Sequence, residues 1–347
     1  MKNSIKKMGT YKPPLEGRSS QGFLLLDFNE RTTQVSESVR EALVDFIQSP
    51  RLQTYPEYGD IEQRLASYAK VSDEQVMVTS GSDQGIDIVF RAFCDSSSEV
   101  IIPSPSFAMF YQSAAVEGAE IISPAYTADY QYPLEEVLSS INENTKVIVV
   151  CNPNNPTGTV LNVDGVLKIA KAAPQAAILV DECYVEFSGV SVCEYVGEFK
   201  NIFVTRTLSK TWGLPSLRFG YLVSDEENIE NLKKVRGPYD VSTISVVAAR
   251  AALENPEYME SYVDEVLNVS KPMLEDFLSS RGIEYWPSAA NFILCYPPDG
   301  DKLVEDLKEE GILVRPRTGP GIEGSVRISL GTKEQTQRLI SVLNETL

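Results

Sequence analysis

Residues 147–158 read VIVVCNPNNPTG, a run of β-branched residues that enters a turn rich in Asn, Pro and Gly. A strand followed by such a turn is typical of the carboxyl edge of an open α/β sheet, where the loops form the ligand crevice. Residues 177–181, AILVD, form a second apolar run that ends in the carboxylate of Asp181. On these residues alone, the turn could be purely structural, and Asp181 could cap a helix or form an ion pair.

Short apolar runs alternate with amphipathic stretches from about residue 60 onward, which indicates βαβ units and a mainly parallel sheet. Apolar residues three and four positions apart predict helices between the runs, at 83–93, 107–117, 163–173 and 226–235. The fold class we expect is therefore α/β, with a three-layer αβα domain around one seven-stranded, mainly parallel sheet. Its predicted strands are 75–79, 99–103, 119–123, 146–151, 177–181, 201–205 and 219–223.

The last third of the chain changes character and predicts a smaller α+β domain. Its expected helices are 241–253, 257–282, 302–310 and 333–347, and its expected strands are 291–296, 312–315 and 325–330. The first residues contain Pro13 and Pro14, an extended run at 23–28 and a helix at 36–48. We expect residues 1–45 to form an arm and part of the small domain, 46–245 the large domain, and 246–347 the small C-terminal domain.

The composition excludes several classes of function. Lys and Arg total 31 against 49 Asp and Glu, and the formal charge of −18 argues against a nucleic-acid or membrane-surface partner. The 347 residues include no histidine, which removes Ser-His-Asp and Cys-His catalysis and histidine-ligated zinc, and we expect no metal. The five cysteines form no C-x-x-C pair, and no apolar run reaches the length of a membrane span. We expect reduced thiols and a cytoplasmic protein.

A third motif, TRTLSKTWGLPSLRFG at residues 205–220, places Lys210 after a strand and among apolar neighbours. Arg206 and Arg218 lie close to it in sequence. Burial and nearby cations lower the pKa of a lysine, which is what a Schiff-base amine requires. Taken alone, a lysine such as Lys210 is more often a solvated surface group.

The order of these motifs resembles the fold type I pyridoxal-phosphate aminotransferases, and the histidinol-phosphate aminotransferases in particular. The resemblance rests on Asn-Pro-Thr-Gly, then Asp-x-x-Tyr, then Ser-Lys with an arginine eight residues later. It extends from Tyr11-Lys-Pro-Pro to Arg327-Ile-Ser-Leu-Gly331 and so covers nearly the whole chain. Gln84 and Pro215-Ser216 depart from the pattern of the family. The resemblance implies an aspartate-aminotransferase-like fold.

The resemblance also implies pyridoxal 5'-phosphate as the cofactor and a role for each matching residue. Lys210 would hold the cofactor covalently and move the substrate proton, and Asp181 would keep the pyridine nitrogen protonated. Tyr184 and Asn155 would donate to the phenolic oxygen of the ring. Phe107 would stack on the ring face. The cofactor phosphate would be held by Ser82, Asp83, Thr207, Ser209 and Arg218, together with Tyr55 from the other subunit of a homodimer.

On the substrate side, the resemblance implies that Arg327 binds the α-carboxylate as a bidentate fork. Asn29 and Glu30 occupy the substrate-side positions of the family, and Arg315 could contact a distal phosphate. Arg327 could instead be a surface arginine on a strand, and Arg315 could pair with Glu309 or Glu310. A further match, G-x-G-x-x-G at residues 319–324, precedes a predicted strand instead of a helix, so we interpret it as a loop.

We therefore expect transamination of small amino and keto acids. The favoured reaction converts histidinol phosphate and 2-oxoglutarate to imidazole acetol phosphate and glutamate, as in histidine biosynthesis. Three alternatives stay open: an aromatic amino-acid aminotransferase, a threonine-phosphate decarboxylase on the same scaffold, and a pyridoxal-phosphate-binding regulator or carrier without catalysis.

Overall fold

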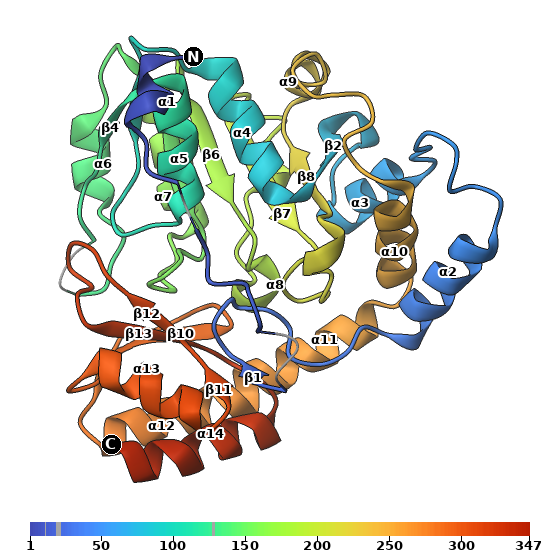
Figure 1. Ribbon diagram of the computed structural model, residues 1–347. Coiled ribbons are helices and arrows are strands. Elements are labelled where there is room, and N and C mark those ends of the chain that lie inside the picture. Colours follow the sequence, from blue (N-terminus) through green and yellow to red (C-terminus); the bar gives the residue numbers. More distant parts are fainter. Residues whose placement is uncertain (11, 19–21, 127–128) are drawn as a thin grey trace.

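The structure is a computed structural model that describes residues 1–10, 12–18, 22–126 and 129–347, so Tyr11 lies outside the described residues. The chain folds into a large unit around a seven-stranded sheet and a smaller unit below it in Figure 1. The N-terminal chain begins at the far end of the large unit and runs along it to the small one (Figure 1). No helix within the described ranges is long and apolar enough to cross a membrane.

The large sheet has the strand order β2-β8-β7-β6-β5-β3-β4. Strands β3 to β7 run parallel, whereas β8 is antiparallel to both of its neighbours. The predicted fold class and all seven predicted strands are confirmed, with ends that differ by at most two residues. The strands are β2 (Val76–Thr79), β3 (Glu99–Ile101), β4 (Glu120–Ile122), β5 (Thr145–Cys151), β6 (Ala177–Asp181), β7 (Ile202–Thr207) and β8 (Gly220–Val223).

Helices cover both faces of this sheet because alternate residues of each buried strand point to opposite sides. In β5, Val147 and Val149 join the core under α4 (Gly81–Phe93), α5 (Ala108–Glu117) and α9 (Glu226–Leu232). Ile148 and Val150 belong to the core on the other face. That face is covered by α2 (Glu37–Gln48), α3 (Ile61–Ala69), α6 (Leu134–Ser140), α7 (Val163–Ala172) and α10 (Thr243–Leu253).

The small unit is a four-stranded antiparallel sheet, in the order β12-β13-β10-β9, against a layer of helices. Its strands are β9 (Glu284–Tyr285), β10 (Phe292–Tyr296), β12 (Arg315–Arg317) and β13 (Ser325–Ser329). Its helices are α11 (Pro256–Glu265), α12 (Lys271–Ser280), α13 (Gly300–Glu309) and α14 (Lys333–Thr346). Strand β1 (Leu24–Leu25) pairs with β11 (Ile312–Leu313) and so ties the N-terminal arm to this unit. Two further helices are short: α1 (Asn3–Lys7) and α8 (Val185–Ser188).

Three predicted elements differ from the structure. The single strand expected at 312–315 is two strands in two sheets, because the chain leaves β1 at Val314 and then pairs with β13. In the extended run at 23–28, only Leu24 and Leu25 form a strand. The helix expected at 257–282 contains a π-helical segment at Val266–Ser270. Pro272 follows this segment and has no N–H to donate to the preceding turn. The G-x-G-x-x-G match lies in the loop between β12 and β13, as predicted.

We predict that Gly220→Ala destabilises the large unit where β8 meets the start of α4. A Cβ on Gly220 would lie 2.5 Å from the carbonyl carbon of Gly81 and 2.7 Å from the amide nitrogen of Ser82. Backbone atoms cannot move aside as a flexible side chain does, so the free energy of unfolding should fall by about 1–3 kcal/mol in denaturant titrations. Gly9→Ala is the matched control, because nothing lies within 4 Å of a Cβ there. Equal stability of both variants would contradict this account.

Candidate active site

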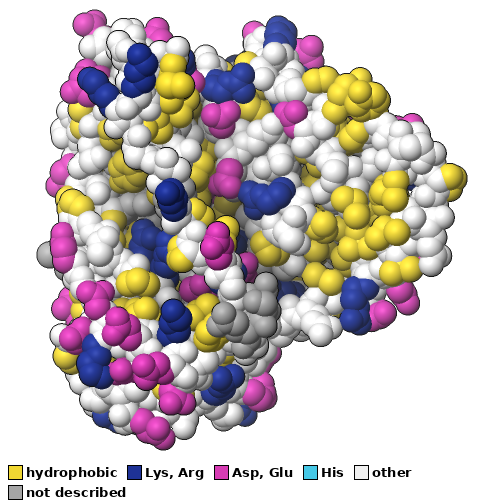
Figure 2. Space-filling model, in the orientation of Figure 1, with side chains coloured by type: hydrophobic (Ala, Val, Ile, Leu, Met, Phe, Trp, Pro, Cys, Tyr) yellow, Lys and Arg dark blue, Asp and Glu magenta, His cyan; other side chains and the backbone are white. Residues whose placement is uncertain are grey.

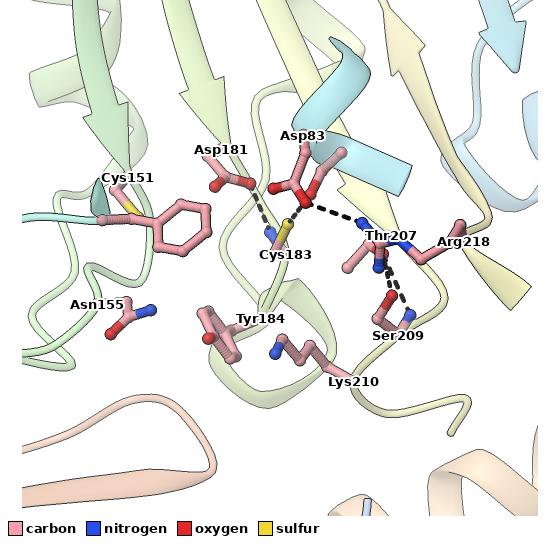
Figure 3. Close-up of a pocket in the computed structure, with 12 residues that line it drawn as sticks. Asp83, Cys151, Asn155, Asp181, Cys183, Tyr184, Thr207, Ser209, Lys210 and Arg218 are labelled. Carbon is pink, nitrogen blue, oxygen red and sulfur yellow. Dashed lines mark hydrogen bonds and ion pairs between the residues drawn. The ribbon is translucent and has the colours of Figure 1, made fainter. Parts of the chain in front are cut away.

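A cavity of about 110 Å³ opens at the carboxyl ends of β5, β6 and β7 (Figure 3). The ends of β5 and β6 lie level with each other, because Cys151 is in register with Asp181. Strand β7 continues for two residues beyond Thr205, which is in register with Asp181. Ten of the eleven predicted cofactor-binding residues line this cavity, and Cys151 and Cys183 line it with them. The ten are Ser82, Asp83, Phe107, Asn155, Asp181, Tyr184, Thr207, Ser209, Lys210 and Arg218.

Asp181 is the last residue of β6, and its side chain is only 3% exposed. It accepts hydrogen bonds from the backbone N–H of Cys183 at 3.3 Å and from the hydroxyl of Thr205 at 3.2 Å. Neither donor is charged, and no Lys or Arg in the described part of the chain forms an ion pair with it. Burial raises the pKa of Asp181 to about 6. The site therefore presents a buried carboxyl group that would be stabilised by a cationic partner.

Another part of the cavity lining provides donors suited to a phosphate group. Helix α4 begins beside Ser82, and the hydroxyl of Ser82 accepts a hydrogen bond from the thiol of Cys183 at 3.1 Å. Thr207 and Ser209 join each other through their hydroxyls at 2.9 Å. Arg218 donates to Asp83 at 2.8 Å, and both side chains are partly exposed. A helix N-terminus with hydroxyls and an arginine is a favourable environment for a dianion.

Lys210 extends into the cavity near Tyr184 (Figure 3). Its Nζ donates to the backbone carbonyl of Phe28 at 3.0 Å and lies 5.8 Å from the ring centroid of Tyr184. Burial lowers the pKa of Lys210, and the charge of Arg327 acts in the same direction. A lysine held this way is a better nucleophile than a surface lysine, because more of it is neutral near physiological pH. The half-buried position of Lys210 in a cavity argues against the solvated-surface alternative.

A second cavity of about 210 Å³ shares Lys210 and Asn155 with the first and contains three arginines. They are Arg315 and Arg317 on β12 and Arg327 on β13. Arg327 is buried and donates to the side-chain oxygen of Asn155 at 2.6 Å. It also donates to the backbone carbonyl of Asp27 at 2.7 Å. Burial lowers the pKa of Arg327 to about 10, so it still carries its charge at neutral pH.

Among the predicted substrate-side residues, Asn29, Arg315 and Arg327 line this second cavity, and Glu30 does not. Asn29 donates through its side-chain nitrogen to the hydroxyl of Tyr184 at 3.0 Å. Glu30 instead accepts a hydrogen bond from Arg18 at 2.7 Å. The guanidinium of Arg315 lies 5.1 Å from the ring centroid of Phe28.

Tyr55 lies away from both cavities in this single chain. Its side chain is 74% exposed and stacks on Tyr239 with ring centroids 4.5 Å apart. The expectation that Tyr55 reaches the site from another subunit stays a prediction.

Sequence reasoning missed Cys151, Cys183 and Arg317 as lining residues. Arg317 could have been found, because residues two apart on a strand share a face and so Arg317 lies on the face of Arg315. Cys183 stands two residues after Asp181, at the point where β6 ends, so strand alternation alone does not predict its direction.

The lining residues fit pyridoxal phosphate. Asp181 would pair with the ring nitrogen, and the start of α4 with Thr207, Ser209 and Arg218 would hold the phosphate. Lys210 provides a half-buried amine whose pKa is lowered by burial, and it lines the same cavity. The observation that supports this fit is the buried Asp181 carboxyl group, with which no Lys or Arg of the described ranges forms an ion pair.

We predict that Asp181→Asn changes how the stability of the cofactor-free protein depends on pH. The pKa of the folded state, about 6, lies above the reference value of 3.8, so the folded protein favours the protonated acid. This contribution to stability is complete below about pH 4 and is lost as the pH rises through about 6. In urea titrations, wild type should lose up to about 3 kcal/mol relative to Asp181→Asn between these pH values. A difference that does not vary with pH would contradict the prediction.

Comparisons with known proteins agree with this geometry. The sequence profile of the family "Aminotransferase class I and II" matches residues 21–343. A histidinol-phosphate aminotransferase of Bacillus subtilis (strain 168) is 32% identical over 363 aligned positions, covering 100% of this chain and 99% of that protein. A histidinol-phosphate aminotransferase of Caldanaerobacter subterraneus is 32% identical over 326 aligned positions, which cover 93% of this chain and 92% of that protein.

Among solved structures, the histidinol-phosphate aminotransferase of Sinorhizobium meliloti in complex with pyridoxal-5'-phosphate superimposes with a TM-score of 0.90. It is 23% identical to this chain and covers 100% of it and 97% of its own length. An aspartate aminotransferase mutant of Thermus thermophilus has a TM-score of 0.83 at 22% identity, and the match covers 100% of this chain and 99% of that one. The predicted aspartate-aminotransferase-like fold is confirmed by these two structures, and the predicted family by the sequence comparisons. The chain belongs to the aminotransferase class I and II family.

Proposed function

We propose that this protein transfers an amino group from histidinol phosphate to 2-oxoglutarate with pyridoxal phosphate as its cofactor. The products are imidazole acetol phosphate and glutamate. The observation that carries the proposal is that the desolvated amine of Lys210 is shared by two cavities, one that fits the cofactor and one that contains three arginines. The full-length similarity to histidinol-phosphate aminotransferases supports the choice of substrate.

Lys210, Asp181 and Asn155 would have different roles in the transfer of the amino group. Pyridoxal phosphate supplies an electron sink for the electrons released at the α-carbon of the substrate. The Nζ of Lys210 would act as the base and acid that moves the proton between the α-carbon of the substrate and the methine carbon of the cofactor. Asp181 keeps the ring nitrogen protonated. Asn155 accepts from Arg327 through Oδ1, which leaves its side-chain NH₂ group to donate to the cofactor.

The three arginines would bind the anionic end of the substrate. Glutamate carries an α-carboxylate, whereas histidinol phosphate carries a phosphate that is one methylene and one oxygen farther from its α-carbon. A carboxylate would bind Arg327, and the longer phosphate arm would also reach Arg315. The positions of Arg315 and Arg327 support this, because the two residues are direct neighbours across β12 and β13.

An aromatic amino-acid aminotransferase and a threonine-phosphate decarboxylase would use the same Lys210, Asp181 and Arg327. Only the substrate that the protein converts can therefore distinguish these alternatives from the proposed reaction. A solved threonine-phosphate decarboxylase structure has a TM-score of 0.80 at 23% identity, which concerns the fold alone. A carrier or regulator without catalysis would show no amino transfer with any donor. We further propose a cytoplasmic location, which is supported by five buried cysteines that form no disulfide.

We predict that Arg315→Ala lowers kcat/KM for histidinol phosphate and leaves that for phenylalanine nearly unchanged. A charged hydrogen bond to the phosphate contributes about 1.5–3 kcal/mol, which corresponds to a loss of about 10- to 150-fold. Steady-state kinetics with both donors measure this, with Lys210→Ala as the inactive control. Equal effects on both donors, or a wild-type preference for phenylalanine, would favour the aromatic alternative instead.

We also propose that the protein is a homodimer whose interface includes Tyr55. Apolar side chains are exposed over α2 and the loops beside it: Val44, Ile47, Leu52, Tyr55 and Tyr239. Figure 2 shows hydrophobic side chains gathered on this side of the molecule. Exposed apolar side chains gathered in one patch are typical of protein–protein contact sites. A second copy of the chain would cover them and bring its own Tyr55 toward the cofactor phosphate.

Mixed dimers test this arrangement. If Tyr55 acts across the interface, co-expressed Tyr55→Ala and Lys210→Ala chains should form dimers in which both lesions fall in one site and the other site is intact. Activity should then return to roughly half of the wild-type value per mixed dimer. The measurement is specific activity of the purified mixed dimer beside each inactive single variant. If Tyr55 acts within its own chain, every site keeps one lesion and no activity returns.

A further inference from the structure

The N-terminal arm reaches the site at residues 27–30, where it contacts three of the site residues. The backbone carbonyl of Asp27 accepts from Arg327 at 2.7 Å, and that of Phe28 accepts from Lys210 at 3.0 Å. Asn29 donates to the hydroxyl of Tyr184 at 3.0 Å. The position of this segment therefore affects both cavities.

Arg18 binds this segment from outside the two cavities. Its guanidinium donates to both carboxylate oxygens of Asp27, at 3.0 and 2.5 Å, and to Glu30 at 2.7 Å. It also lies 4.5 Å from the ring centroid of Phe28, the ring that Arg315 approaches at 5.1 Å. Arg18 is 9% exposed and Asp27 is 4% exposed, so solvent screens this pair little.

The carboxylates of Asp27 and Glu30 also affect the pKa values of Arg327 and Lys210, the residues that would bind and react with the substrate. Burial lowers the pKa of Arg327 and the pKa of Lys210, and the charges of Asp27 and Glu30, respectively, oppose that lowering. Arg18 is the cation that binds both carboxylates directly. Without it, two negative charges next to the three-arginine cavity would lack that partner and would compete with an anionic ligand for the same arginines.

We propose that Arg18 is a positioning residue that holds Asp27 and Glu30 away from the substrate arginines, so that the second cavity remains available to an anion. This inference rests on the proposed function only in naming the anion as the substrate's phosphate or carboxylate. Arg18 itself would not touch the substrate, because it lines neither of the two cavities. Its effect would therefore appear in ligand affinity and KM much more than in kcat.

The test is a double-variant cycle of Arg18→Gln, Asp27→Asn and Arg18→Gln/Asp27→Asn, made in the cofactor-loaded protein. Binding of inorganic phosphate is measured by calorimetry, and Arg327→Met shows whether the signal comes from the second cavity. We expect Arg18→Gln to weaken phosphate binding about 10-fold. Removing the competing charge with Asp27→Asn should recover most of that loss, and Arg18→Lys should lie between wild type and Arg18→Gln. For glutamate, the KM should rise with little change in kcat.

The rescue by Asp27→Asn separates a charge effect from a structural one. If Arg18 only fastens the arm, the double variant loses the same contacts and binds phosphate as weakly as Arg18→Gln. That result would overturn the inference, as would unchanged binding by Arg18→Gln, or no phosphate binding by wild type. If wild type binds phosphate and shows the rescue but transfers no amino group, the proposed function fails and the role of Arg18 stands.

Discussion

The burial of one carboxyl group, Asp181, is the constraint on which the rest of the site depends. It sits at the end of a strand that is apolar on both faces, and its two hydrogen-bond donors are neutral. The free energy of an unpaired buried carboxylate is high, so the acid is stable there only when it is protonated or paired with a cation. A pyridinium nitrogen satisfies that requirement, and the lysine and phosphate donors of the same cavity lie where the rest of such a cofactor would need them.

The parallel sheet explains why these groups meet. Strands β5 and β6 end level with each other, β7 ends two residues farther on, and the residues at and just after these ends surround a single cavity. Asn155, Asp181 and Lys210 follow three different strands and are far apart in sequence. In this arrangement the sheet core supplies the rigidity, and the short loops after the strands supply the chemistry.

Charge is distributed unevenly in this protein. The whole chain carries a formal charge of −18, yet three arginines and Lys210 line the second cavity. At physiological ionic strength the screening length is about 8 Å, so distant acidic residues have little effect on a ligand in this cavity. Acidic residues near the cavity have a larger effect on such a ligand. Two of them, Asp27 and Glu30, belong to the N-terminal arm, and Arg18 forms ion pairs with both of their carboxylates.

The sequence by itself determined the large sheet, the order of its motifs and most of the cofactor cavity. It could do so because apolar runs and their polar ends are local patterns, and parallel strands bring those ends together in a regular way. Ten residues that the resemblance to the aminotransferases implied as cofactor-binding line one cavity. Only the tertiary structure decided the pairings that depend on contacts between distant segments. It split 312–315 between two sheets, directed Glu30 to Arg18, paired Arg315 with Arg327 across β12 and β13, and left Tyr55 exposed on the surface. No local pattern encodes these outcomes, because each depends on which part of the chain packs against an element after the sheet has formed.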